Sequence, residues 1–271
     1  MAHPETWLRV LPAGLYCAPG DFFVDPTRAV GRAVVTHAHS DHARPGHGAV
    51  LASAATLALM RARGVAGHSE QALGWGERLR IGGVELWLQP AGHVLGSAQV
   101  VMEYQGSRVV VSGDYKRQPD RSCDPFVPVA CDVFVSEATF ALPVFRHPPA
   151  EAEIGRLLAS VALFPGRTHV VGCYSLGKTQ RLITLLRAAG WDAPVYLHGA
   201  LAAMCAVYEA QGVRLGDLRP ATVAAKSALA GSIVLAPPSA IADRWARRLT
   251  EPVVCMASGW MRVRQRAKQD G

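Results

Sequence analysis

Three histidines and one aspartate fall within six consecutive positions, in the order His37-Ala-His39-Ser-Asp41-His42. The apolar run Ala-Val-Val before Thr36 predicts a strand, so this cluster begins where a strand ends. In an extended chain His37, His39 and Asp41 would share one side, and His42 needs a turn to join them. Imidazole and carboxylate groups are ligands for Zn²⁺ and similar metals, and crowding so many together is costly without a cation. The cluster therefore predicts a metal site on a loop at a strand end.

Further donors follow other apolar runs. His93 lies in Gln-Pro-Ala-Gly-His and Asp114 in Ser-Gly-Asp, each directly after a glycine. Strand ends of this kind can deliver ligands to one rim, and glycines allow the backbone to approach closely. His93 taken alone would more often be a surface or hydrogen-bonded core residue. Asp25 ends an earlier strand-like run, where a carboxylate can orient either a ligand imidazole or a metal-bound water.

The pattern of apolar residues changes along the chain. Short β-rich runs dominate the first half, with one helix predicted over 53–64, and three prolines interrupt regular structure at 141–150. Beyond them, helical patterns over 151–164, 178–190, 200–212 and 242–250 alternate with strand patterns over 168–174, 193–199, 232–238 and 252–258. This alternation predicts βαβ units and a mostly parallel sheet.

Composition limits the class of protein. Of the 271 residues, 50% are hydrophobic and 18% charged, which excludes a disordered chain, and the apolar stretches are too short to span a membrane. Lys and Arg outnumber Asp and Glu by 28 to 21, which favours a polyanionic partner. Six scattered cysteines and an N-terminus without a secretory signal predict a reducing, cytoplasmic location.

The first half resembles the metallo-β-lactamase fold, through Thr-His-Ala-His-Ser-Asp-His at 36–42, Ala-Gly-His-Val-Leu-Gly-Ser at 91–97 and Ser-Gly-Asp at 112–114. This resemblance implies an α/β αββα sandwich with its metal site along one edge of the two sheets. It further implies that His37, His39 and His93 bind one metal. Asp41 and His42 would bind a second, Asp114 would bridge the two, and Asp25 matches the first-motif aspartate of the family.

The second half resembles the β-CASP nucleases, through Ser-Glu-Ala-Thr-Phe at 136–140, Gly-Cys-Tyr-Ser-Leu-Gly-Lys-Thr at 172–179 and Tyr-Leu-His-Gly at 196–199. Taken whole, the chain is similar to the bacterial DNA ligase-associated exonucleases. The resemblance implies a metallo-β-lactamase-like domain over 1–143, an inserted β-CASP-like α/β domain over 144–260 and a basic tail over 261–271. Glu137 matches the acidic β-CASP motif. His198 matches the downstream histidine more weakly, and an ordinary strand-end histidine is an equal alternative.

These resemblances predict a metal-dependent phosphodiesterase that hydrolyses DNA, an exonuclease of DNA repair. The expected cofactor is one or two Zn²⁺ ions, with Mn²⁺ or Mg²⁺ as alternatives, and the expected partner is DNA, with functional links to a DNA ligase and a helicase and no membrane. The residues expected to act in catalysis are Asp41, Asp114, Glu137 and His198.

Three alternatives remain at this stage. The first is an RNA-processing nuclease of the same fold. The second is a catalytically impaired nucleic-acid-binding protein, because family members continue past Ser-Gly-Trp-Met-Arg into a segment with a further ligand histidine. The third is a nucleotide-binding P-loop, because residues 172–179 fit G-x-x-x-x-G-K-T between a strand and a helix, although the later strands lack the Asp that would hold Mg²⁺. If the loop at 172–179 binds no nucleotide, its Lys178 and Thr179 could still contact a nucleic-acid phosphate.

Overall fold

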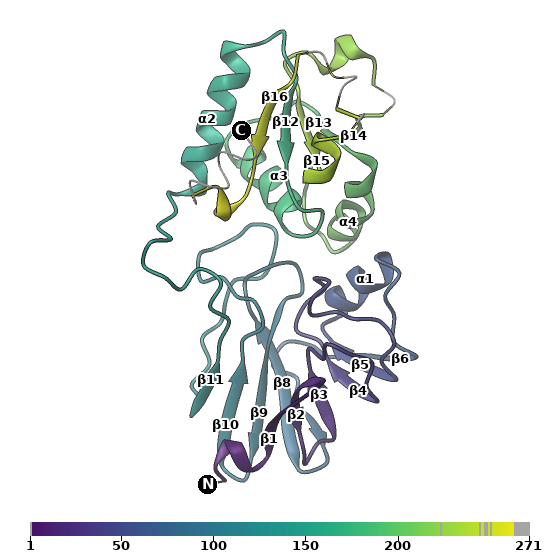
Figure 1. Cartoon of the computed structure of the whole chain (residues 1–271), viewed down its shortest axis with the longest axis vertical. Coiled ribbons are helices and arrows are strands. Elements are labelled where there is room, and N and C mark those ends of the chain that lie inside the picture. Colours follow the sequence, from purple (N-terminus) through teal and green to yellow (C-terminus); the bar gives the residue numbers. More distant parts are fainter. Residues whose placement is uncertain (1, 223, 244, 247–248, 250, 263–271) are drawn as a thin grey trace. The chain divides into compact units, whose positions relative to one another are not determined.

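A computed structural model describes residues 2–262 of the chain, apart from residues 223, 244, 247, 248 and 250. The chain divides into two compact units, residues 1–138 and 139–271, and each is considered by itself (Figure 1). The domain limits expected at 143 and 260 remain predictions. Residues 263–271 of the expected basic tail lie outside the described residues.

The first unit contains two β-sheets. The six-stranded sheet runs in sequence order through β1 (Leu8–Leu11), β2 (Gly14–Cys17), β3 (Phe22–Val24), β4 (Arg32–Val34), β5 (Ala49–Ala52) and β6 (Ser69–Ala72). The five-stranded sheet has the order β11-β10-β9-β8-β7, from β7 (Leu79–Ile81), β8 (Val84–Pro90), β9 (Ala98–Tyr104), β10 (Ser107–Val111) and β11 (Val133–Val135). Strands β7 to β10 are antiparallel, whereas β3 to β6 are parallel.

The core of this unit lies between the two sheets. Successive side chains of a strand point to opposite faces, and alternate residues such as Leu86 and Leu88 of β8 are fully buried. They belong to one cluster with Phe22 and Val34 of the six-stranded sheet and Met102 of β9. The mixed α/β sandwich expected for this half is confirmed.

Helix α1 (Ala54–Ala62) begins at the predicted place. The hydroxyl of Ser53 accepts the N–H of Thr56 at 3.1 Å, as a helix N-cap does. The hydroxyls of Ser53 and Thr56 also donate to the carbonyl of Gly96, at 2.7 and 2.9 Å. These bonds tie the start of α1 to the loop between β8 and β9, which carries His93.

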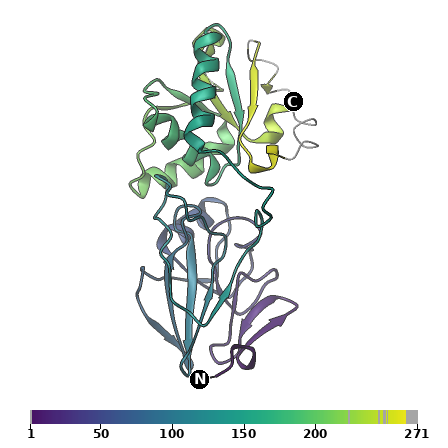
Figure 2. The same cartoon turned by 90° about the vertical axis from the view of Figure 1, so that its left-hand side faces the viewer.

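The second unit is a parallel sheet with helices. Its strand order is β14-β13-β15-β12-β16, from β12 (His169–Gly172), β13 (Val195–Leu197), β14 (Leu218–Pro220), β15 (Ile233–Ala236) and β16 (Val253–Met256), and all pairs are parallel. Helices α2 (Ala150–Leu163), α3 (Lys178–Ala188) and α4 (Gly199–Ala210) contact one another in series on one face (Figure 2). On the other face, Ala240 of α5 (Pro238–Ile241) packs with Val170 and Val234.

The parallel sheet confirms the βαβ pattern. Helix α5 ends at Ile241 after starting on consecutive prolines. The helix predicted over 242–250 remains a prediction, because residues 244, 247, 248 and 250 lie outside the described residues. Strand β14 was not predicted, because Leu-Arg-Pro is too short and polar to give a strand signal. Among the described residues, no helix has the length and apolar character needed to cross a bilayer.

Candidate metal centre

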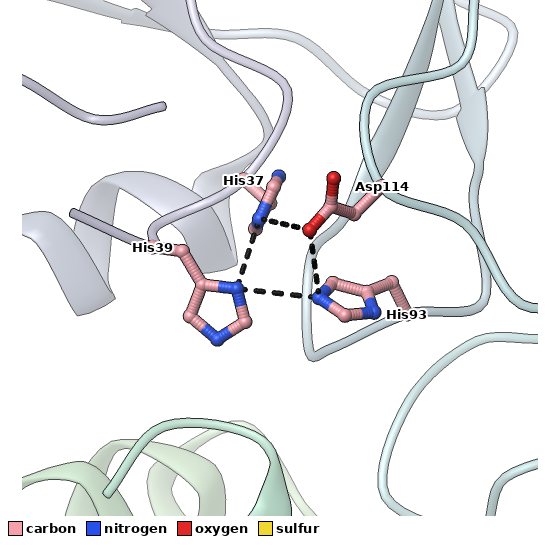
Figure 3. A group of neighbouring side chains, drawn as sticks. All are labelled: His37, His39, His93 and Asp114. Atoms are coloured by element: carbon pink, nitrogen blue, oxygen red, sulfur yellow. Dashed lines mark hydrogen bonds and ion pairs between the residues drawn. The ribbon is translucent and has the colours of Figure 1, made fainter. Parts of the chain in front are cut away.

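Four predicted ligands meet in the first unit, although they come from three separate loops. His37 and His39 follow β4, His93 lies between β8 and β9, and Asp114 follows β10. Figure 3 shows their ring nitrogens and one carboxylate oxygen converging, and the four ligand atoms all lie within 4.8 Å of one another. The structure therefore forms one group of donors from residues up to 77 positions apart in the sequence.

The distances between the donor atoms suit a metal ion. His39 Nδ1 lies 3.0 Å from His37 Nε2 and 3.2 Å from His93 Nε2. Asp114 Oδ2 lies 3.7 Å from His37 Nε2 and 3.5 Å from His93 Nε2. Donors held about 2.0–2.1 Å from a tetrahedral Zn²⁺ are separated by roughly 3.3 Å. Three imidazoles and a carboxylate at these spacings fit a divalent cation, and they do not identify which one.

Side-chain hydrogen bonds hold the two histidine loops in place. Ser97 Oγ accepts the backbone N–H groups of His93 and Val94, at 3.0 and 3.1 Å, which closes the turn that presents the His93 ring. Arg63, just after α1, donates to the carbonyl of Ala38 between His37 and His39. The first contact is local in sequence and the second joins residues 25 positions apart, and each holds the backbone beside a donor histidine.

Asp25 links two of the histidines. Its Oδ2 accepts the hydroxyl of Thr36 at 2.6 Å and His42 Nδ1 at 2.7 Å, while its Oδ1 accepts the Thr36 N–H at 2.8 Å. The Thr36 hydroxyl, having donated to Asp25, accepts from His37 Nδ1 at 3.0 Å. The His37 ring is thereby held with Nδ1 protonated, which leaves its Nε2 lone pair for a cation. The His42 ring is held by the same carboxylate and must lose its Nε2 proton before that atom can bind a metal.

The Asp25 carboxylate reaches this position through an uncommon backbone conformation, with φ at +44°. Aspartate visits the left-handed region more readily than most residues. Thr36 was not among the residues predicted from the sequence, because its part in the site depends on its hydrogen bonds to Asp25, eleven residues away.

His42 and Asp41 lie beside the four-residue group. His42 Nε2 is 3.4 Å from Asp114 Oδ1 and 3.7 Å from Asp41 Oδ2. Asp114 thus turns one oxygen toward His37 and His93 and the other toward His42. This placement suits the expected bridging of two ions, and the assignment of Asp41, His42 and Asp114 to a second metal remains a prediction. The Asp41 side chain is largely exposed, at 71%.

Burial and neighbouring charges set the proton occupancy of the group. Burial lowers the pKa of His93 to about 4, and burial with the adjacent histidines lowers the pKa of His37 well below its usual value. Burial also acts to lower the pKa of His42, but hydrogen bonds to Asp114 and Asp25 outweigh it and raise the pKa to about 10. For Asp114, the His42 hydrogen bond and the nearby imidazoles overcome burial and lower the pKa. His37 and His93 are therefore neutral near pH 7, as metal ligands must be.

Gly92 precedes His93 where only glycine fits. Its φ is +73°, and a Cβ there would lie 2.3 Å from the carbonyl oxygen of Lys116 and 2.9 Å from the amide nitrogen of Phe126. We expect Gly92→Ala to lower the free energy of unfolding by about 3 kcal/mol, from backbone strain and the clash together. Gly64→Ala is the matched control, because φ is +71° but no atom lies within 4 Å. It should cost about 1 kcal/mol. Urea unfolding measures both, and equal losses would contradict the close approach.

Two further predicted catalytic residues lie outside this group. Glu137 follows β11 and is half-buried. His198 is the N-cap of α4, where Nδ1 accepts the N–H of Ala200 at 3.1 Å and the ring packs edge-on against Trp245. This is the strand-end role that sequence analysis kept as an alternative. Catalytic roles for Glu137 and His198 remain predictions.

The loop that fits the P-loop pattern uses its own donors internally. Thr179 is fully buried, its hydroxyl donates to the Tyr174 carbonyl at 2.8 Å, and its N–H donates to the same carbonyl at 3.1 Å. The N–H of Gly177 donates to Gln180 Oε1 at 2.8 Å. A phosphate-cradling loop needs these groups directed at its ligand. The geometry therefore argues against a nucleotide site and against a phosphate contact by Thr179, whereas the Lys178 side chain is half-buried and its phosphate contact remains a prediction.

Several known proteins are similar to the chain. No protein-family model matches the chain. A protein of Opitutus terrae named "Probable DNA ligase" is 32% identical over 255 residues, which cover 91% of this chain and 24% of that protein. A ribonuclease of Thermus thermophilus is 30% identical, covering 67% of this chain and 49% of its own length. Cleavage and polyadenylation specificity factor subunit 3-I of Arabidopsis thaliana is 28% identical over 52% of this chain and 22% of its own length.

The chain spans between about a quarter and a half of the length of these relatives. Among solved structures, a protein of unknown function from Enterococcus faecalis V583 matches with a TM-score of 0.50 and 12% identity. The match covers 85% of this chain and 59% of that one, and it supports the fold.

Proposed function

Because the chain belongs to the metallo-β-lactamase/β-CASP nuclease family, we propose that it hydrolyses phosphodiester bonds of DNA with a divalent metal ion. The observation that carries the proposal is the convergence of His37, His39, His93 and Asp114 from three loops. These residues would hold one ion, with Asp41 and His42 beside Asp114 for a second. We expect Zn²⁺, with Mn²⁺ or Mg²⁺ as alternatives.

When bound, such a cation polarises a phosphoryl oxygen and makes a water nucleophile available near neutral pH. The protein's own part is to keep the donors ordered. Asp25 fixes the His42 ring, and through Thr36 the His37 ring, so that neither histidine must reorient. Asp41 is exposed next to His42, where its carboxylate can accept a proton or orient a substrate group. Glu137 and His198 are proposed to contribute through the family motifs that they match.

DNA is proposed as the substrate because 91% of this chain matches a relative named "Probable DNA ligase". A functional link to a DNA ligase is part of the same proposal, together with a helicase and a role in DNA repair. Exonuclease action is likewise proposed from the resemblance of the whole chain.

RNA is the second candidate substrate. It is favoured by the relatives named as ribonucleases and as an mRNA cleavage factor subunit, which match 44–67% of this chain. These matches are shorter than the match to the ligase-named protein, so DNA is placed first.

End-labelled single-stranded DNA and RNA of one sequence, incubated with the purified chain, test the proposal. We expect cleavage of DNA that a chelator abolishes and added Zn²⁺ or Mn²⁺ restores, with slower cleavage of RNA. Faster RNA cleavage would favour the second candidate. Binding without cleavage of either polymer at any metal concentration would leave the impaired nucleic-acid-binding protein, and cleavage insensitive to the chelator would contradict the metal site.

A further inference from the structure

A small pocket lies at the carboxyl ends of the strands in the second unit. It has a volume of about 150 Å³ and is lined by residues at or just after the ends of β12, β15 and β16, among them Tyr174, Pro238, Met256, Ser258 and Trp260. All of these residues belong to residues 139–271, so the pocket is formed by one unit alone.

The topology of the sheet explains why a pocket forms here. Strands β12 and β15 are neighbours, but β12 leads through α3 to β13 on one side, whereas β15 leads through α5 to β16 on the other. Connections that leave adjacent strands in opposite directions open a crevice beyond their carboxyl ends, where α/β sheets bind ligands. The pocket lies at the carboxyl ends of β12 and β16, with Pro238 of α5 in its lining.

The pocket wall is aromatic and anchored. The Trp260 ring packs 5.1 Å from Phe140 and 5.7 Å from Phe145, measured between ring centroids. His147 Nε2 bonds the carbonyl of Gly259 at 3.1 Å, which fixes the segment that carries Trp260. Tyr174 is 60% exposed, so its ring is open to a binding partner. A rigid indole and an open phenol ring form a surface on which a planar group can stack.

Size and charge indicate what the planar group belongs to. A cavity of about 150 Å³ accepts a benzene-sized ring. Residues 139–271 contain 16 Lys and Arg against 8 Asp and Glu, whereas residues 1–138 contain 12 against 13, so the positive charge of the chain resides in the second unit. A flat ring carried by a polyanion is a nucleobase on its phosphodiester backbone.

We propose that this pocket binds an unpaired nucleobase of a single-stranded nucleic acid, stacked on Tyr174 and Trp260. The inference rests on the proposed nuclease function and extends it, because a base that enters the pocket must first leave a duplex. The Ser258 hydroxyl accepts the backbone N–H of Trp260 at 3.2 Å and can turn its own hydrogen toward a base edge.

Binding of a fluorescent single-stranded DNA oligonucleotide to the metal-free full chain tests the proposal without cleavage. We expect Tyr174→Ala to weaken binding by about 5- to 150-fold, the range for one stacked base. Tyr174→Phe keeps the ring and should bind as the parent does. Phe164→Ala removes a 40% exposed ring elsewhere in the same unit and serves as the matched control. An abasic oligonucleotide of equal length should bind the parent and Tyr174→Ala equally.

Two results would overturn the inference. Equal binding of the base-bearing oligonucleotide by the parent and Tyr174→Ala shows that the pocket takes no base, and the nuclease proposal is then still judged by cleavage. An equal loss on the abasic oligonucleotide shows that Tyr174 contacts the backbone instead. If the parent binds neither DNA nor RNA and cleaves neither, the proposed function fails and the inference with it.

Discussion

Replacing His93 with alanine is expected to weaken Zn²⁺ binding by more than about 100-fold, because loss of an outer-shell partner alone costs 10–100-fold and His93 supplies a donor atom itself. Its Nε2 lies 3.2 Å from His39 Nδ1 and 3.5 Å from Asp114 Oδ2, so removal opens one side of the donor group. The associated loss of several kcal/mol of transition-state stabilisation predicts DNA cleavage slower by on the order of 10³-fold. Competition with a fluorescent chelator measures the affinity, and gel assays measure the rate.

The control for this variant is His68→Ala. His68 is an exposed histidine of the same unit and makes no contact with the donor group, so metal binding and cleavage should both be unchanged. Parental Zn²⁺ affinity in His93→Ala would show that the four residues do not form the site. Lost affinity with full cleavage would separate the metal site from the reaction.

The substitution Asp25→Asn is expected to lower metal affinity by about 10- to 100-fold, although Asp25 is not placed among the ligands. An asparagine keeps Oδ1 for the Thr36 N–H, but its amide cannot accept both the Thr36 hydroxyl and His42 Nδ1 as Oδ2 does. The two rings then lose the partner that fixes their orientation. The pKa of His42 should fall, because the Asp25 carboxylate no longer helps to raise it, and a ¹⁵N titration of the His42 ring measures the shift.

Three variants separate orientation from general damage. Thr36→Val removes the hydroxyl between Asp25 and His37 and should reproduce part of the loss, whereas Thr36→Ser keeps it and should not. Asp124→Asn is the matched control, since Asp124 accepts an exposed hydrogen bond from Trp75 at 3.2 Å. Unchanged affinity and ring signals in Asp25→Asn would contradict the positioning role.

The sequence singled out the donors that converge, because donor residues and strands leave clear local signals. His37, His39, His93 and Asp114 each follow an apolar run, and the structure brings them together, whereas their role as ligands, with Asp41 and His42, remains a prediction. Thr36 was not assigned, because its role depends on Asp25, eleven residues away and held at a positive φ that no sequence pattern encodes.

In the second unit, too, features with a local sequence signal were predictable and features that depend on distant residues were not. Long amphipathic segments such as α2 and α3 were predictable, since their apolar spacing repeats over several turns. Strand β14 was not predictable, because its three residues are too few to show a period. Trp245 and Leu249 pack against the sheet cluster, and the helix predicted around them remains a prediction because part of 242–250 lies outside the described residues. The aromatic wall of the pocket at Trp260 could not be predicted from the sequence either, because it joins residues 112 or more positions apart, such as His147 and Gly259.

The uneven division of charge between the two units gives the molecule a strong electrostatic polarity. A polyanion approaching by diffusion meets an attractive field from residues 139–271 and almost none from residues 1–138. For the proposed nuclease, ionic strength is therefore expected to act mainly on capture of the polymer, through counterion release, and little on the nearly neutral unit that holds the donor group. In kinetic terms, the proposed function would place encounter with the polymer in one unit and the chemical step in the other.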